Sequence, residues 1–203
     1  MSFKIYGVAR SRAFRTLWMA AELGLPYEHV KTDFESGTRT ADFLKLNPNG
    51  HVPVIDDDGF VLWESMAINL YLAKRYSSGT LYPADIGGEA RAWQWSFWAM
   101  TEVERHALAA LLNRIGPEDK RDAAAADAGE RALAAPLKLL DGIVGAGRYL
   151  IGNQFTVADL NVASILAWAR QARVDMAAFP NMQAWLRACH DRPAAKAARE
   201  LQR

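Results

Sequence analysis

The chain has 203 residues, of which 51% are hydrophobic and 23% are charged, and this composition is typical of a folded globular protein rather than a disordered one. Lysine and arginine number 24 against 23 aspartates and glutamates, without a block of like charge, so we expect no nucleic-acid partner. The single cysteine, Cys189, excludes an intrachain disulfide and a CxxC redox pair. No spacing of His, Asp or Glu residues indicates a metal site.

The sequence carries no recognisable targeting or membrane segment. Residues 1–7 lack the basic stretch and apolar core of a secretory signal. The longest apolar stretch, residues 160–169, is interrupted by polar side chains and falls short of the roughly 20 residues that span a bilayer. We therefore expect a cytoplasmic protein with no membrane partner.

Residues 1–77 alternate strand patterns with helical ones. Apolar residues at helical spacing begin at Phe14 and end before Gly24, which favours a helix end because glycine tolerates a positive φ. The expected elements are, in chain order, a strand at 3–6, a helix over 14–23, a strand at 25–31, a hairpin of 52–55 with 60–63 around an Asp56–Gly59 turn, and a helix over 65–76. This order predicts an α/β domain.

Residues 78–87 indicate a linker, and residues 88–203 indicate an all-α domain. The expected helices cover residues 88–115, 122–144, 156–173 and 181–191. Thr156 and Asp159 have the spacing of a capping box at the start of the third of these helices. We therefore assign both residues to folding and stability rather than to catalysis.

Four motifs occur in one order along the chain. They are Tyr6-Gly7 with Ser11-Arg-Ala-Phe-Arg15, Asn47-Pro-Asn-Gly-His-Val-Pro-Val-Ile55, Leu62-Trp-Glu-Ser-Met-Ala-Ile68, and Phe155-Thr-Val-Ala-Asp159. Together they resemble the cytosolic glutathione transferases over nearly the whole chain. The resemblance implies a thioredoxin-like N-terminal domain that binds glutathione as a co-substrate, a helical domain that shapes the site for an electrophile, and a homodimer.

Ser11 is the candidate catalytic residue. The thiol of glutathione has a pKa near that of cysteine, about 8.5, so a transferase must stabilise the thiolate. A hydroxyl at the start of the first helix can donate a hydrogen bond to the sulfur, while the helix N-terminus adds positive potential. The position of Ser11 before Arg15 resembles serine-type classes such as theta. Two alternatives remain: Ser11 only caps the helix, or Tyr6 donates to the sulfur.

Two departures from related classes bear on the chemistry. Beta-class members have a cysteine where this chain has Arg10, and zeta-class isomerases have a Ser-Ser-Cys triplet where it has residues 10–12. These differences argue against mixed-disulfide chemistry and against maleylacetoacetate isomerisation, respectively.

The second and third motifs supply candidate glutathione contacts. The resemblance implies that Pro53 is cis and that the backbone of Val52 pairs with the cysteinyl part of glutathione. His51 would contact the glycyl carboxylate, or else be a solvated loop residue. Glu64 can pair with the γ-glutamyl ammonium, and Ser65 with its carboxylate at a helix N-terminus. Alternatively, Glu64 and Ser65 only form an acidic, capped helix start.

The sequence offers candidates for the site of the electrophile in the helical domain. A run of large apolar side chains opens the helical domain and would line either the electrophile pocket, the core or a subunit interface: Trp93, Trp95, Phe97, Trp98 and Met100. We expect a glutathione S-transferase that acts on small hydrophobic electrophiles. The alternatives are a non-catalytic glutathione-binding module and a glutathione-dependent peroxidase or isomerase.

Overall fold

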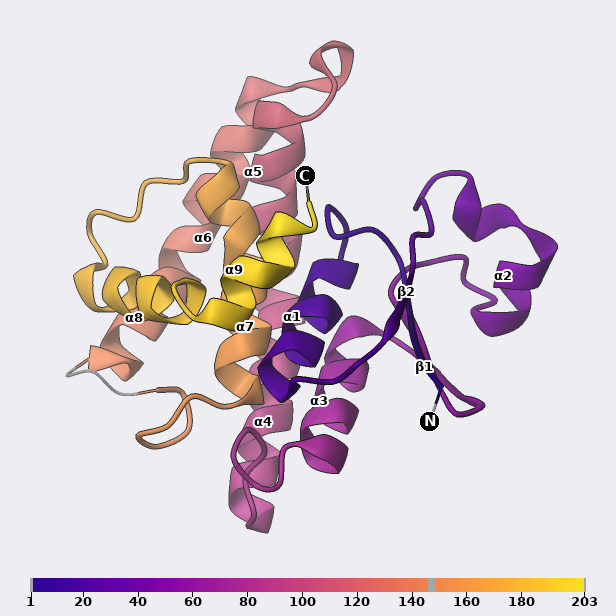
Figure 1. Ribbon diagram of the computed structural model, residues 1–203. Helices are drawn as coiled ribbons and strands as arrows, with labels where there is room; N and C mark the ends of the chain where they lie inside the picture. The colour runs from indigo at the N-terminus through magenta and orange to yellow at the C-terminus, as the bar shows by residue number, and fades with distance from the viewer. Residues whose placement is uncertain (1, 146–148, 203) are drawn as a thin grey trace. The chain divides into compact units, whose positions relative to one another are not determined.

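The computed structural model describes residues 2–145 and 149–202 (Figure 1). One compact unit combines Met1–Tyr82 with Asp191–Arg203, and the other is Pro83–His190. The sequence placed residues 88–203 together in the helical domain. The two divisions therefore differ at the C-terminal segment, which packs with the first unit.

The first unit is built on a four-stranded sheet with the order β2-β1-β3-β4. Its strands are β1 (Phe3–Tyr6), β2 (Glu28–Val30), β3 (Val54–Asp57) and β4 (Phe60–Trp63). β1 pairs parallel with β2 and antiparallel with β3, and β3 pairs antiparallel with β4. This mixed sheet confirms the predicted α/β class and the thioredoxin-like arrangement.

Helices cover both faces of this sheet, with α1 and α3 on one side and α2 on the other in Figure 1. The helices are α1 (Ala13–Leu23), α2 (Ala41–Leu46), α3 (Ser65–Tyr76) and α9 (Pro193–Glu200), with a 3₁₀ turn at Gly37–Arg39. Ile5 and Ile55 are fully buried, whereas Tyr6 points to the other face and packs with Phe43. The sequence did not predict α2, because six residues are too few to show a helical period.

The predicted hairpin forms with a tighter turn than expected. β3 continues through Asp57, which pairs with Phe60, so the turn holds only Asp58 and Gly59. Both have positive φ, 53° and 93°, which is the geometry of a type I′ turn. Asp57 is buried.

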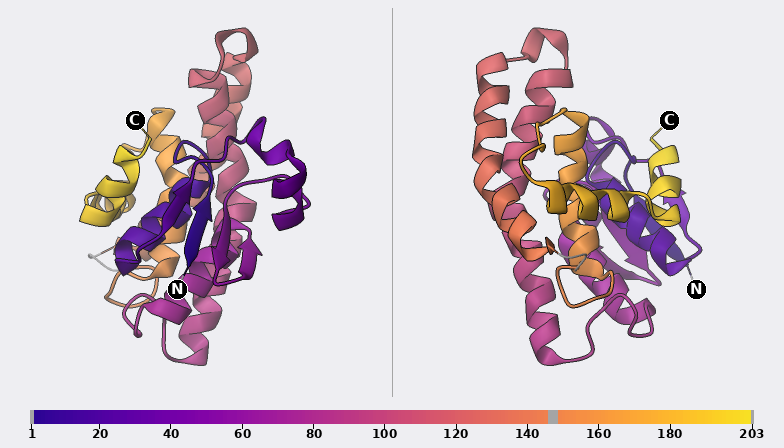
Figure 2. Two further views of the ribbon diagram at one scale, coloured as in Figure 1. Left: turned by 45° about the vertical axis from the view of Figure 1, so that its right-hand side comes forward. Right: turned by 90° about the vertical axis from the view of Figure 1, so that its left-hand side faces the viewer.

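The C-terminal segment is held against α1 and the loop before it by polar contacts. Arg192 donates from Nε and Nη2 to the two carboxylate oxygens of Glu22, each at 2.7 Å. Gln202 Nε2 donates to the carbonyl of Ala9 at 3.1 Å. Figure 2 shows α9 beside α1. These contacts give the physical reason why residues 191–203 pack with the first unit.

Helices, joined by loops, are the regular secondary structure of the described residues of the second unit. It contains α4 (Ile86–Trp98), a π-helical segment (Ala99–Glu104), α5 (Arg105–Ile115), a 3₁₀ turn (Glu118–Lys120), α6 (Ala123–Ile143), α7 (Val157–Gln171) and α8 (Pro180–His190). α5 and α6 run side by side in Figure 2. Most of α7 is buried, as expected for the central helix of this unit.

The start of α7 confirms the predicted capping box. The backbone N–H and the hydroxyl of Thr156 both donate to Oδ2 of Asp159, at 3.0 and 3.1 Å. Oδ1 of Asp159 accepts from the backbone N–H of Leu150 at 2.9 Å and from Nε1 of Trp185 at 3.0 Å. Burial raises the pKa of the Asp159 carboxyl, against the effect of these donors. Asp159 therefore joins α7, α8 and the preceding loop.

Candidate functional site

The strand register of the first unit brings several chain segments to one edge of the sheet. Tyr6, the last residue of β1, lies opposite Val30 at the end of β2 and Val54 at the start of β3. Val54 in turn lies opposite Trp63, the last residue of β4. The segments that leave β1, β2 and β4, and the one that enters β3, therefore all lie at this edge. They include three of the four sequence motifs.

Gly7 allows the segment that leaves β1 and the segment that enters β3 to approach each other. Its φ is +133°, and a Cβ there would lie 2.6 Å from Cβ of Ala13 and 3.1 Å from Cβ of Val52. Any side chain at position 7 would push apart the start of α1 and the Val52 loop. The Gly7 carbonyl accepts a hydrogen bond from Nε2 of His29 at 2.7 Å. The loop that carries the candidate catalytic serine therefore packs beside Val52.

Ser11 lies in this loop, two residues before α1 begins. Its hydroxyl donates to the carbonyl of Val8 at 2.7 Å and accepts from the backbone N–H of Ala13 at 3.1 Å. The side chain is half-buried. The helix-start role that the sequence left open for Ser11 is thus present, because its oxygen serves one of the first N–H groups of α1.

Tyr6, the alternative donor, directs its ring to the sheet face that packs on α2. The ring makes an edge contact with Phe43, with 6.4 Å between centroids, and packs against the cluster of Phe43, Val52 and Val54. Among the described residues, its hydroxyl makes no hydrogen bond. The ring of Tyr6 therefore contributes to apolar packing.

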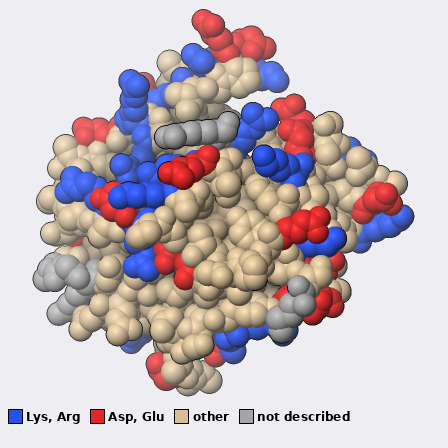
Figure 3. Space-filling view, in the orientation of Figure 1, with Lys and Arg blue, Asp and Glu red and all other residues tan. Residues whose placement is uncertain are grey.

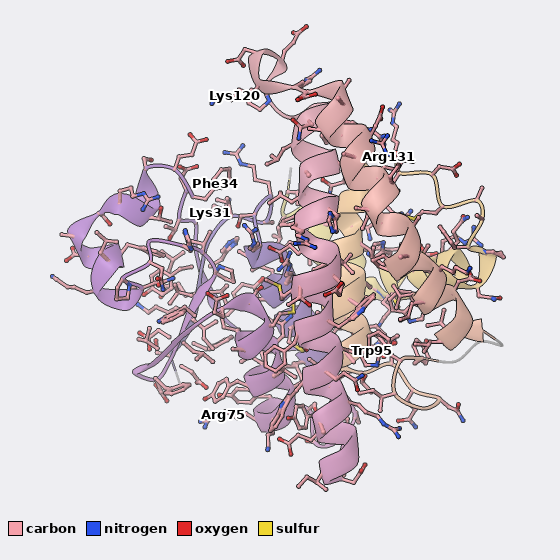
Figure 4. All side chains as sticks on the ribbon, turned by 180° about the vertical axis from the view of Figure 1, so that it is seen from behind. Lys31, Phe34, Arg75, Trp95, Lys120 and Arg131 are labelled. Atoms are coloured by element: carbon pink, nitrogen blue, oxygen red, sulfur yellow. The ribbon has the colours of Figure 1, made fainter. Side chains whose placement is uncertain are left out.

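The segment after β2 contacts the Ser11 loop. Figure 4 labels Lys31 and Phe34 in this segment. Nη2 of Arg10 lies 3.8 Å from Oδ2 of Asp33, and its guanidinium carbon lies 6.0 Å from the ring centre of Phe34. Arg10, the residue before Ser11, therefore points toward this segment.

The Val52–Pro53 peptide bond is cis, which confirms the expectation from the resemblance. Val52 and Pro53 are buried, and β3 begins only at Val54, so the sheet ladder does not use the backbone of Val52. Asn47 Nδ2 donates to the backbone carbonyl of His51 at 2.8 Å, and this hydrogen bond closes the loop between residues 47 and 51. The side chain of His51 itself is exposed.

Glu64 occupies an unusual backbone conformation at the start of α3. Its φ is 73° and its ψ is 110°, a region that non-glycine residues rarely adopt and that is enriched at functional sites. Its exposed carboxylate makes no capping hydrogen bond and, among the described residues, no ion pair. The next residue, Ser65, is buried and accepts a hydrogen bond from Nη1 of Arg15 at 3.2 Å.

Arg39 is a further candidate that the sequence motifs did not single out. A Cβ built on Gly50 would lie 2.8 Å from Nη1 of Arg39, so the guanidinium lies against the residue before His51. Gly50 has a φ of +63°. No spacing pattern joins positions 39 and 50, and only the fold brings them together.

In the second unit, the aromatic residues of α4 divide between interior and surface. Trp95, labelled in Figure 4, is 8% exposed and stacks edge-on with Trp98 at 5.2 Å between centroids. Trp93 and Phe97 are 46% and 66% exposed. Trp95 is therefore a core residue, which was one of the expected alternatives.

Two kinds of feature are absent from the described part of the chain. Within it, no helix has the length and apolar character needed to cross a membrane. No group of three or more His, Cys, Asp and Glu side chains in residues 2–145 and 149–202 is arranged to hold a metal ion. The face in Figure 3 carries charges of both signs, interspersed.

Comparison with known proteins gives consistent matches. Residues 1–74 match the family described as the glutathione S-transferase N-terminal domain, and residues 103–193 match its C-terminal domain. The chain is 34% identical over 188 residues to glutathione S-transferase GstB of Escherichia coli K12, covering 90% of this chain and 89% of that protein. It is 36% identical over 206 residues to glutathione S-transferase 3 of Zea mays, covering 94% and 90%.

Among solved structures, a theta-class glutathione S-transferase from Xanthomonas axonopodis pv. citri with glutathione bound superposes with a TM-score of 0.90. It is 28% identical to this chain, and the match covers 97% of this chain and 96% of that one. The sequence matches and the structural match span both units in the same order. The chain therefore belongs to the glutathione S-transferase family.

Proposed function

We propose that the protein conjugates glutathione, through its sulfur, to hydrophobic electrophiles and that Ser11 stabilises the thiolate. Transferase activity follows from the family to which the chain belongs. The observation that carries the assignment of the site is the meeting of the Ser11 loop, the Val52–Pro53 segment and the Glu64–Ser65 segment at one edge of the sheet. In this proposal the Ser11 loop faces the thiol of glutathione, the backbone of Val52 faces the cysteinyl residue, and Glu64 and Ser65 face the γ-glutamyl residue.

The cysteinyl part binds to the backbone of Val52 in this proposal. The β3 ladder begins two residues later, so the N–H and C=O of Val52 are left for an added extended segment. The contact of Gly7 with Val52 keeps this backbone beside the Ser11 loop. The sulfur of the bound cysteinyl group would therefore lie near the start of α1.

The two ends of glutathione carry charges that the site can match. Glu64 pairs with the γ-glutamyl ammonium, while Ser65 and the first N–H groups of α3 bind the carboxylate of the same residue. His51 binds the glycyl carboxylate, and the guanidinium of Arg39, which lies against Gly50, adds positive charge on that side.

Ser11 acts by a change of hydrogen-bond partner. Its hydroxyl turns from the Val8 carbonyl to the sulfur, while its oxygen keeps the bond from the Ala13 N–H, which makes the hydroxyl a stronger donor. The thiol proton leaves to solvent, and the thiolate attacks the electrophilic carbon as the C–S bond forms and the leaving group departs. Each unit by which the thiol pKa falls corresponds to about 1.4 kcal/mol of preference for the anion.

We assign the donor to Ser11 rather than Tyr6, as in the serine-type classes. The ring of Tyr6 is used in packing against Phe43 on the α2 face of the sheet, whereas Ser11 lies at the positive end of a helix. The match to a theta-class structure with glutathione bound supports this choice.

We also propose a homodimer, as the family resemblance implies. Ile86 and Phe97 lie on one face of α4 and are 87% and 66% exposed, which leaves apolar side chains at the surface. Sedimentation equilibrium tests this: a mass near twice 22.5 kDa supports the dimer, and a mass near 22.5 kDa at micromolar concentration contradicts it.

The function itself is tested with purified protein, glutathione and three electrophiles: an aryl halide, an epoxide and an organic hydroperoxide. Products are identified by mass spectrometry. A thioether from the aryl halide or the epoxide supports the proposal. Glutathione binding without turnover would assign a binding module, and glutathione disulfide formed only with the hydroperoxide would assign a peroxidase.

A further inference from the structure

Arg15 is a buried cationic side chain on α1 that reaches the start of α3. It lies in the first turn of α1 and is 1% exposed. Its Nη1 donates to Oγ of Ser65 at 3.2 Å, and its backbone carbonyl accepts from Nδ2 of Asn69 at 3.3 Å. Ser65 and Asn69 lie one turn apart on α3. The two helices are thus joined at two points, which fixes the guanidinium beside Ser65.

This contact decides which way the Ser65 hydroxyl points. A guanidinium offers N–H donors and no acceptor, so the Ser65 oxygen accepts in this bond and its own hydrogen must point elsewhere. Among the described residues, no protein acceptor takes that hydrogen. Arg15 therefore leaves Ser65 as a donor for a ligand. The positive charge also polarises the hydroxyl and strengthens it as a donor.

The open start of α3 defines the ligand group that this donor suits. The Glu64 side chain does not cap the helix, so the first N–H groups of α3 and the Ser65 hydroxyl are donors at the same helix end. Such a set of donors fits a carboxylate. We propose that Arg15 is a positioning residue for the γ-glutamyl carboxylate of glutathione, acting through Ser65. This inference rests on the proposed function.

A fixed hydroxyl binds more tightly than a free one because its rotational freedom is already lost before the ligand arrives. Substitution of Arg15 by an apolar residue of similar length, Arg15→Met, should therefore weaken the Ser65 contact without removing the hydroxyl. We expect a loss of about fivefold in glutathione affinity, the size of one net hydrogen bond.

Isothermal titration calorimetry with two ligands tests this role. The first ligand is glutathione, and the second is γ-aminobutyryl-cysteinyl-glycine, which lacks the carboxylate in question. The wild-type protein should prefer glutathione. Arg15→Met should reduce this preference by about fivefold and leave the affinity for the analogue unchanged. Adding Arg15→Met to Ser65→Ala should have no further effect, because both changes act on one contact.

Two controls separate positioning from general stability. Leu17→Ala removes a fully buried side chain from the same helix but keeps the Arg15–Ser65 hydrogen bond, so it should lower the melting temperature and leave the ligand preference intact. Arg15→Lys keeps a cationic donor and should retain part of the preference.

The outcomes distinguish this inference from the proposed function. If Arg15→Met lowers the affinity for both ligands equally, Arg15 does not position the hydroxyl. The same conclusion follows if the effect of Arg15→Met on affinity adds fully to that of Ser65→Ala. In both cases the protein still binds glutathione. If the wild-type protein binds neither ligand, the proposed function is overturned and the inference fails with it.

Discussion

The helices α3 and α7 begin in opposite ways. At α7, Thr156 and Asp159 form a complete capping box, and the Asp159 carboxylate accepts four hydrogen bonds. At α3, the residue before the helix is Glu64, whose φ is 73° and whose side chain makes no capping bond. The side chains at the start of α7 are hydrogen-bonded within the protein. At the start of α3, no side chain of the described residues caps the first backbone N–H groups.

This difference indicates that the start of α7 contributes to stability and that the start of α3 is suited to binding a ligand. A closed helix start contributes free energy of folding, since its buried polar groups are already satisfied. An open one, at a residue with strained backbone, costs stability and is retained where a ligand completes it. Although the sequence presents an acidic residue and a hydroxyl at both places, only the α3 start belongs to the proposed glutathione site.

The largest expected effect is on the closed helix start. Asp159→Ala would leave the buried donors of Leu150, Thr156 and Trp185 without an acceptor, and we expect a loss of about 3 to 5 kcal/mol in the free energy of unfolding. Urea unfolding followed by circular dichroism measures this. Asp159→Asn, which keeps one carbonyl oxygen, should lose less. A loss below about 1 kcal/mol for the alanine variant would show that the network is not important for stability.

The next effect is on catalysis. Ser11→Ala removes the proposed donor to the sulfur, and we expect kcat/KM for conjugation to fall about a hundredfold, as for the loss of one oxyanion donor. The pKa of the bound thiol, followed by thiolate absorbance, should rise in the same variant. Tyr6→Phe is the matched control and should change neither value. The reverse pattern would assign the donor to Tyr6.

A smaller effect is expected at the open helix start. Glu64→Gln removes the negative charge proposed to pair with the γ-glutamyl ammonium, so glutathione affinity should fall about tenfold, the loss expected for one charge-assisted contact. Because this carboxylate makes no contact within the described chain, the free energy of unfolding should change by no more than about 0.5 kcal/mol. Calorimetry and urea unfolding measure the two quantities. A large loss of stability with unchanged glutathione affinity would contradict this prediction, because Glu64 would then serve folding, as Asp159 does at α7.

The smallest effect concerns the C-terminal half of α3, where side-chain hydroxyls of the helix donate to a buried carboxylate, Asp57. Tyr71 donates to Asp57 at 2.7 Å, and burial together with this carboxylate raises the pKa of Tyr71 from 10.0 to about 12. The folded protein therefore keeps a proton that the unfolded chain releases. This stabilisation is complete below pH 10 and is lost as the pH rises through about 12.

Tyr71→Phe removes this titrating group. The unfolding free energy of the wild-type protein should therefore fall more steeply between pH 10 and 12 than that of the variant. Thermal unfolding across this range measures both slopes. Equal slopes would contradict a raised pKa at Tyr71.

The sequence predicted what local chemistry determines. The helix end at Gly24, the existence of the hairpin before residue 63 and the capping box at Thr156 each depend on residues within a few positions of one another, although the hairpin turn is two residues shorter than the predicted Asp56–Gly59 turn. The expected helix over residues 88–115 contains a π-helical segment, Ala99–Glu104, which is too short for a pattern of apolar residues to distinguish from an α-helix.

The contacts that complete the candidate site are long-range, and no spacing rule contains them. Arg15 meets Ser65 fifty positions along the chain, and Arg39 meets Gly50 only because of the fold. The C-terminal helix packs on α1 through Arg192 and Glu22, which are 170 positions apart. The candidate site residues were predicted from the family resemblance. The strand register of the structure explains why three of the four motifs lie at one edge of the sheet.

A crystal structure of the protein with glutathione bound tests the central claim most directly. We predict that the sulfur lies within about 3.5 Å of the Ser11 hydroxyl and that the γ-glutamyl carboxylate lies at the start of α3 beside Ser65. A sulfur within that distance of the Tyr6 hydroxyl instead, or a tripeptide bound away from the edge that joins Gly7, Val52 and Glu64, would contradict the account.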